Sequence, residues 1–261
     1  MIKIAKKTIK MKFIYSLQSE WLKTKRSAAS WLCLIGGLFI PTIYLIAFLY
    51  KHKTIEGIDG KGAWMIHFGS LMTNMQMFLL PMGVILASSL ITQMEFKNNT
   101  WKQLHTTPQS LTTIFLSKFT VIALMTAKFF LFFNLGIIIS GLIPSLIFNG
   151  RMPEETFPWK FFIEENTYVF MACLPIIAIQ FLISLQFKNF LVAIGIGLVG
   201  LIGTLIGLGN WDQLYVSPYS YVLANAQNIN FGMNLHGSSI IYFSIIMLIS
   251  YVLYIKKKEK G

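Results

Sequence analysis

Charged side chains are scarce in this chain, and acidic ones are the scarcest. Asp, Glu, Lys and Arg make up 12% of the 261 residues, only 10 residues are acidic, and 55% are hydrophobic. Soluble domains carry about 25% charged residues. The composition therefore argues against a soluble enzyme and predicts an all-α protein with several membrane-spanning helices.

Cysteine is almost absent as well, and the two cysteines, Cys33 and Cys173, fall inside separate apolar runs. Such cysteines form neither a disulfide framework nor a metal cluster, so we interpret them as packing residues. The four histidines lie in different segments without a partner constellation. We therefore expect no catalytic residue and no metal site in this chain.

Motifs that bind nucleotides or perform hydrolysis are also missing. The sequence contains no G-x-x-x-x-G-K-[ST], no H-E-x-x-H and no G-x-S-x-G. Without a phosphate-binding loop, the chain is not expected to bind ATP by that route or to hydrolyse it. No cofactor is expected in the chain itself.

Six long apolar runs are present instead. They cover residues 31–50, 64–94, 111–148, 167–186, 190–209 and 238–255, and each is long enough to cross a bilayer. The stretches between them are too short to form an independent core. The sequence thus predicts one transmembrane domain over residues 1–261, with residues 1–30 as a cytoplasmic or interfacial segment.

The distribution of basic residues predicts the orientation. If the N-terminus is cytoplasmic, sixteen basic residues lie in the inner segments and five in the outer loops. Cytoplasmic loops carry the excess of Lys and Arg, so both termini are predicted to face the cytosol. The same bias accounts for the net charge of +12 through contact with anionic lipid in the plasma membrane, without a nucleic-acid partner.

Residues 11–22 are expected to form an amphipathic helix. Met11, Ile14, Leu17, Trp21 and Leu22 share one side, and the other side includes Lys12, Ser16, Ser19 and Lys23. With eight basic residues in positions 1–30, this pattern favours a helix in the inner headgroup layer. The alternative is an amphipathic helix that packs on protein.

Two outer segments stand out, namely residues 149–166 with four glutamates and residues 210–237 with many aromatic residues. For the second segment we consider two structures. One is a short re-entrant or surface-lying hairpin, and the other is a plain loop with an aromatic belt.

The stretch Glu95–Lys118 is the most polar internal segment on the predicted cytoplasmic side. Phe96, Thr100, Trp101 and Leu104 give a short helix one apolar edge, and Pro108 ends it. Ser110 is predicted to cap the next helix. A short amphipathic helix between two spans is suited to dock into a cytosolic partner.

This pattern, with the six-span layout, resembles the type-2 ABC exporter permeases, and most closely the permease subunits of lantibiotic or bacteriocin immunity transporters. The resemblance implies a separate ABC ATPase that binds ATP, a second permease subunit, identical or related, and export of an amphipathic antimicrobial peptide. It also implies a coupling helix between spans two and three that contacts the ATPase. The coupling residues are Glu95, Phe96, Thr100, Trp101, Leu104 and Pro108.

Five polar residues inside the spans have two interpretations. They are Asn74, Gln76, Lys128, Asn134 and Gln180. They either line a translocation pathway or form hydrogen bonds that hold the helix bundle together. The cost of a buried charge requires Lys128 to face protein, water or an interface.

Two rival functions remain. A non-transporting membrane anchor or sensor could recruit a cytosolic partner through the same loop, and it would need neither an ATPase nor vectorial export. An intramembrane enzyme is disfavoured, because no carboxylate lies in the middle of a span and no histidine constellation is present.

Overall fold

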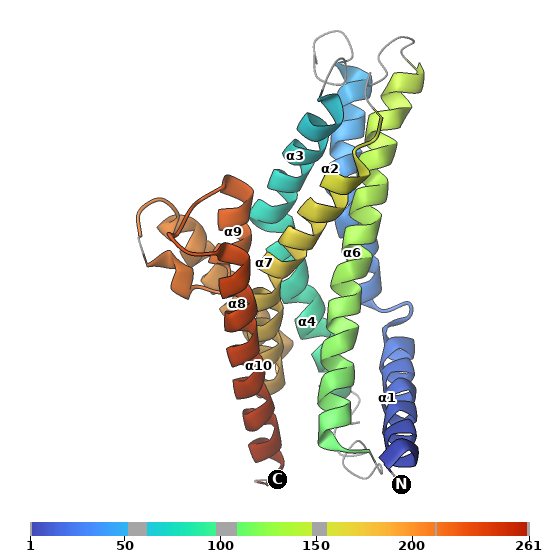
Figure 1. Cartoon of the computed structure of the whole chain (residues 1–261), viewed down its shortest axis with the longest axis vertical. Coiled ribbons are helices and arrows are strands. Elements are labelled where there is room, and N and C mark those ends of the chain that lie inside the picture. Colours follow the sequence, from blue (N-terminus) through green and yellow to red (C-terminus); the bar gives the residue numbers. More distant parts are fainter. Residues whose placement is uncertain (1, 52–61, 98–108, 148–155, 212, 260–261) are drawn as a thin grey trace.

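The computed structural model describes residues 2–51, 62–97, 109–147, 156–211 and 213–259. Every regular element in this part is helical (Figure 1). In chain order they are α1 Ile2–Thr24, α2 Ala28–Tyr50, α3 Ala63–Asn74, the π-helical turn η1 Met75–Leu79, α4 Leu80–Lys97, α6 Leu111–Ile147, α7 Trp159–Gln186, α8 Phe190–Gly207, the 3₁₀ turn η2 Leu214–Val216, α9 Ser220–Gln227 and α10 Leu235–Glu259.

Six stretches of this described part are long and apolar enough to span a membrane, as the hydropathy pattern predicts. They are Ala28–Tyr50, Ala63–Met94, Leu111–Pro144, Trp159–Gln186, Phe190–Gly207 and Leu235–Lys256. The second span comprises α3, η1 and most of α4. The chain is therefore an all-α, multi-pass membrane protein.

The bundle is organised around α4, which packs against α2, α7 and α8, while α6 packs against α2 and α1. The α2–α6 contact is close because each of the two helices has a glycine at the contact. A Cβ on Gly136 would lie 2.7 Å from the Cβ of Pro41, and a Cβ on Gly37 would lie 2.9 Å from the Phe129 carbonyl oxygen. Small residues allow membrane helices to approach in this way.

The second span contains a widened turn whose position follows from Pro81. Proline has no N–H to donate to the carbonyl four residues earlier. One residue before it, the Leu80 N–H instead reaches back five residues to the Met75 carbonyl, which is the π-helical pattern. Pro41, Pro81, Pro144 and Pro175 all lie within helices of the first four spans, and Pro81 is the one that adjoins this π turn.

Three sequence expectations need correction. The helix of the fourth span begins at Trp159, eight residues before the predicted residue 167, because Phe162 is 5% exposed and packs on Phe68 and Phe157. The segment 210–237 is not a plain loop, since it contains η2 and α9, and α9 packs on α3, η1 and α7.

The third correction concerns α1, because the sequence pattern places Ser16 on its polar side. Ser16 is instead buried against α6, as is Glu20, while Ile14 and Leu22 are exposed. The reason is that α6 presents polar partners at this contact. The helix therefore packs on protein. Its apolar residues Ile14 and Leu22 are exposed and free to contact lipid, and the location of the helix in the headgroup layer stays a prediction.

Candidate functional site

α4 ends and α6 begins at one end of the molecule, on either side of the predicted coupling segment in the sequence (Figure 1). The N-terminal end of α1 and the C-terminal end of α10 lie at the same end (Figure 1). This arrangement agrees with an even number of spans. It places both ends of the described chain on the side where α4 ends and α6 begins.

The structure describes the borders of that segment. α4 continues to Lys97, so the backbone of Glu95 and Phe96 lies in its last turn. The side chains of those two residues, and all of Thr100, Trp101, Leu104 and Pro108, lie outside the described part. The coupling role of these six residues stays a prediction.

The start of α6 is as the sequence predicts. The Thr113 N–H donates to Ser110 Oγ over 3.2 Å, and the Ile114 N–H donates to the Ser110 carbonyl over 3.1 Å. Ser110 therefore caps the helix that follows the coupling segment.

Directly beyond this cap, α6 is bound to α1 by a buried polar contact. Ser16 Oγ and Ser117 Oγ lie 2.9 Å apart. The Lys118 ammonium donates to the Glu20 carboxylate over 3.1 Å, with side-chain exposures of only 3% and 9%. Lys23 donates to the other oxygen of the same carboxylate.

The charge state of Glu20 follows from these neighbours. Burial on its own raises the pKa of a carboxyl group, but the ammonium groups of Lys118 and Lys23 outweigh it and hold the pKa of Glu20 below its ordinary value of 4.5. The carboxylate is therefore ionised at neutral pH. Sequence reasoning missed this residue, although Glu20 is the only acid among the eight basic residues of positions 1–30.

Asn134 of α6 forms a closed pair with Asn166 of α7. Each side-chain amide donates to the other's oxygen, over 2.8 and 2.9 Å, and each also donates to a backbone carbonyl four residues earlier. Both amide hydrogens of each residue are thus used within the protein. This geometry supports the bundle interpretation for Asn134.

Gln180 of α7 is completely buried and links three helices. Its amide nitrogen donates to Ser89 Oγ of α4 over 3.1 Å and to the Ala193 carbonyl of α8 over 2.9 Å. Its Oε1 has no hydrogen-bond partner among the described residues. Gly197 makes this arrangement possible, because a Cβ there would lie 2.6 Å from Oε1.

Lys128 lies at the level of the first turn of α2. Its ammonium donates to Ser30 Oγ over 2.6 Å and lies 5.8 Å from the centre of the Phe132 ring. From Leu111 to this level, α6 extends roughly 25 Å at the rise of an α-helix. Lys128, a residue of the third span, therefore lies level with the start of the first span. Its ammonium group contacts protein there, as the cost of a charge within the membrane requires.

The two polar residues of the second span lie at or beside η1 and face different neighbours. Gln76 is 3% exposed, and its Oε1 accepts a 2.8 Å bond from the Asn225 amide of α9. Asn74 is exposed, and its amide nitrogen donates to the Tyr44 hydroxyl of α2 over 2.9 Å. Asn225 and Asn166 were not anticipated, because partners from distant segments leave no local sequence signal.

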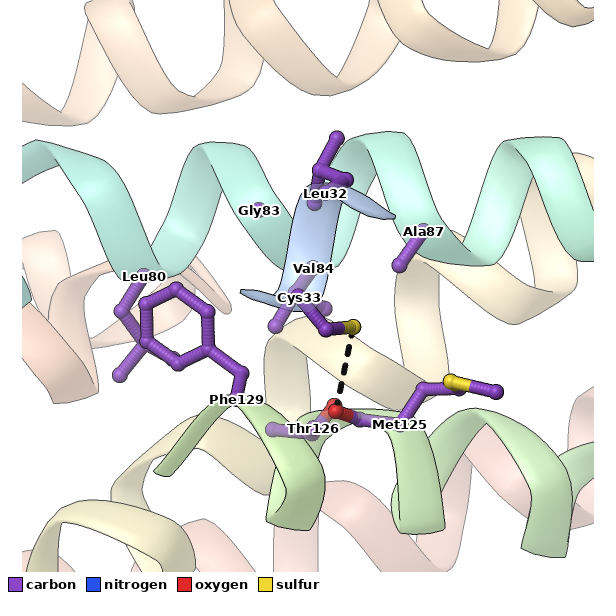
Figure 2. A pocket seen from close by; sticks show the side chains of 9 residues that line it. All are labelled: Leu32, Cys33, Leu80, Gly83, Val84, Ala87, Met125, Thr126 and Phe129. Carbon is purple, nitrogen blue, oxygen red and sulfur yellow. Dashed lines mark hydrogen bonds between the residues drawn. The ribbon is translucent and has the colours of Figure 1, made fainter. Parts of the chain in front are cut away.

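A small cavity lies where α2, α4 and α6 meet (Figure 2). It has a volume of about 10 Å³ and a mostly apolar lining that includes Leu80, Val84 and Phe129. Figure 2 also shows the Cys33 thiol pointing to the Met125 carbonyl, with a distance of 3.3 Å. A space that holds at most one water molecule is a packing junction and has no room for cargo.

No cluster of three or more His, Cys, Asp or Glu that could hold a metal ion occurs in the described ranges. His67 is hydrogen-bonded to α6, because its Nε2 lies 3.0 Å from Ser140 Oγ and 3.2 Å from the Ile137 carbonyl.

Comparison with known families agrees with this architecture. A family model described as "ABC-2 family transporter protein" matches residues 16–204, which is more than half of the chain. The chain belongs to this family of ABC transporter membrane subunits, whose members normally work with an ABC ATPase. The match extends from α1 through most of the fifth span and includes the predicted coupling segment. No curated protein matches the sequence significantly.

Proposed function

We propose that this chain is the permease subunit of an ABC exporter that expels an amphipathic antimicrobial peptide from the membrane or its outer surface. A separate ATPase binds and hydrolyses ATP, and it docks on the cytoplasmic segment around residues 95–108. A second permease subunit, identical or related, completes the pathway. The observation that carries the proposal is the family membership over residues 16–204.

The described structure supports this division of labour. The coupling segment follows directly on the second span and leads directly into the capped start of α6. Movement there can reach the Glu20–Lys118 contact and, through α4, the π-helical turn. Both termini and the coupling segment face the cytosol in this proposal.

Reconstitution tests the proposal. Vesicles that contain the chain and its co-purified ATPase are loaded with ATP on the ATPase side, and movement of a fluorescent amphipathic peptide is followed. We expect ATP-dependent, one-directional movement, and no ATP hydrolysis above background by the chain alone. ATP-independent partner binding without any peptide movement would instead identify a membrane anchor or sensor.

A further inference from the structure

A groove on the surface of the helix bundle lies between α2 and the π-helical turn of the second span. Phe39 and Ile43 of α2 form one wall, and Phe78 and Leu79 of η1 form the other. Its volume is about 330 Å³, in the range of small-ligand sites. Both walls belong to stretches that are long and apolar enough to span a membrane, and Phe39, Ile43 and Phe78 are exposed there.

The groove has one polar feature, the Asn74–Tyr44 pair. The Asn74 amide nitrogen uses both of its hydrogens, on the Tyr44 hydroxyl and on the Ser70 carbonyl. In the described part of the chain, no hydrogen bond involves Asn74 Oδ1 or the hydrogen of the Tyr44 hydroxyl. The pair therefore presents one acceptor and one donor inside an otherwise apolar groove, within a span where unsatisfied polar groups are costly.

The π-helical turn connects this groove to the rest of the bundle. Widened turns of this kind occur frequently at functional sites. On the buried side of the turn, Gln76 is bonded to Asn225 of α9, and on the exposed side Phe78 forms the groove wall. A molecule that pushes Phe78 aside would thus act on the same turn that holds α9.

We propose that this groove is the site where the exported amphipathic peptide first binds, entering sideways from the membrane with apolar side chains against Phe39, Ile43 and Phe78. The inference rests on the proposed function. A peptide supplies both a donor and an acceptor for the Asn74–Tyr44 pair, through its N–H and C=O groups. The ester groups of a phospholipid supply acceptors only, so a peptide fits the pair better than a lipid chain does.

The test uses the complex of the chain and its ATPase in vesicles. The probe is whichever fluorescent member of a panel of amphipathic antimicrobial peptides the wild-type complex moves. Ile43→Trp fills the groove, and Tyr44→Phe removes only the hydroxyl. Ile46→Trp is the matched control, because Ile46 is exposed on α2 but lies outside the groove.

At low peptide concentration, Ile43→Trp should slow export by about tenfold or more, as expected for loss of a central contact. Tyr44→Phe should slow it less, and Ile46→Trp should match the wild type. Export at the wild-type rate by Ile43→Trp and Tyr44→Phe together would overturn the site while leaving the exporter intact. A wild-type complex that moves no peptide would instead refute the proposed function, and the groove assignment with it.

Photo-crosslinking identifies the occupant directly. A benzophenone amino acid replaces Phe78, and the complex is irradiated in the presence of the peptide. We expect an adduct with the peptide that an excess of unlabelled peptide suppresses. Adducts formed only with phospholipid, or only with a second copy of this chain, would contradict the assignment.

Discussion

The side-chain oxygen of Gln76 accepts a 2.8 Å hydrogen bond from the Asn225 amide, and this bond joins the π-helical turn of the second span to α9. The two residues are 149 positions apart in the sequence. Gln76 is 3% exposed and Asn225 is half-buried, so the bond is partly shielded from solvent. It connects the span that leads to the coupling segment with the segment that precedes the last span.

Replacing Gln76 with Leu should loosen α9. The half-buried Asn225 amide would lose its acceptor, and loss of such a hydrogen bond costs about 1 kcal/mol. Hydrogen exchange of the α9 amides should accelerate in the variant. Gln227→Leu is the control, because Gln227 is exposed and its contact with Met77 Sδ is 3.6 Å long. Equal exchange in both variants would show that the bond does not hold α9.

Removing the Glu20 charge should destabilise the α1–α6 contact. Glu20→Gln takes the carboxylate from the buried Lys118 ammonium, and breaking a buried pair from one side costs about 3 kcal/mol. The thermal unfolding of the detergent-solubilised protein measures the effect. Lys23→Ala is the control, since Lys23 is one-third exposed and should cost below about 1 kcal/mol.

The stability that Glu20 provides has a defined pH dependence. The folded protein lowers the pKa of Glu20 below 4.5, so this stability is fully present above pH 4.5. It is lost as the pH falls through the lowered pKa. The difference in melting temperature between wild type and Glu20→Gln should therefore be constant near neutral pH and shrink below pH 4.5. A difference that shrinks already near pH 7 would contradict the assignment.

The Asn134–Asn166 pair distinguishes a bundle contact from a pathway wall. Either single Leu substitution leaves one amide unsatisfied, whereas the double substitution removes both polar groups and should be nearly neutral for stability. A double-mutant cycle should give a coupling of about 0.6–1.7 kcal/mol, as measured for hydrogen bonds between membrane helices. If the double variant is stable but no longer exports, the pair belongs to the pathway.

Much of the fold could be predicted from the sequence because hydropathy and capping are local signals. The six spans follow from apolar runs, and the start of α6 follows from Ser110. The buried face of α1 could not be predicted, because Ser16 and Glu20 are buried only through partners 101 and 98 residues away. The partners of Asn134 and Gln76 were missed for the same reason.

The proposed orientation predicts a labelling pattern in intact cells. Single cysteines at Ile55 and Glu155 should react with an impermeant reagent, and a cysteine at His105 should not. The third outer site is the exposed Asn230, which is preferred to Asn225 because Asn225 is bonded to Gln76. Labelling at His105 without labelling at the outer positions would invert the topology.

The coupling helix is the link on which the whole proposal depends, and Trp101 is its expected anchor. Interface energy concentrates in large, well-desolvated side chains, so Trp101→Ala should weaken ATPase binding by on the order of 2 kcal/mol or more. Glu95→Gln should leave assembly intact but reduce export, because a charge at the end of a helix orients the helix without being buried.

Co-purification of the ATPase with each variant, at matched membrane expression, is the decisive measurement. Trp159→Ala is the control, since Trp159 is exposed at the start of α7, away from the coupling segment. We predict that Trp101→Ala loses the ATPase, while Trp159→Ala and Glu95→Gln retain it. Retention of the ATPase at wild-type affinity by Trp101→Ala would contradict the docking assignment and would make Trp101 a membrane-interface residue.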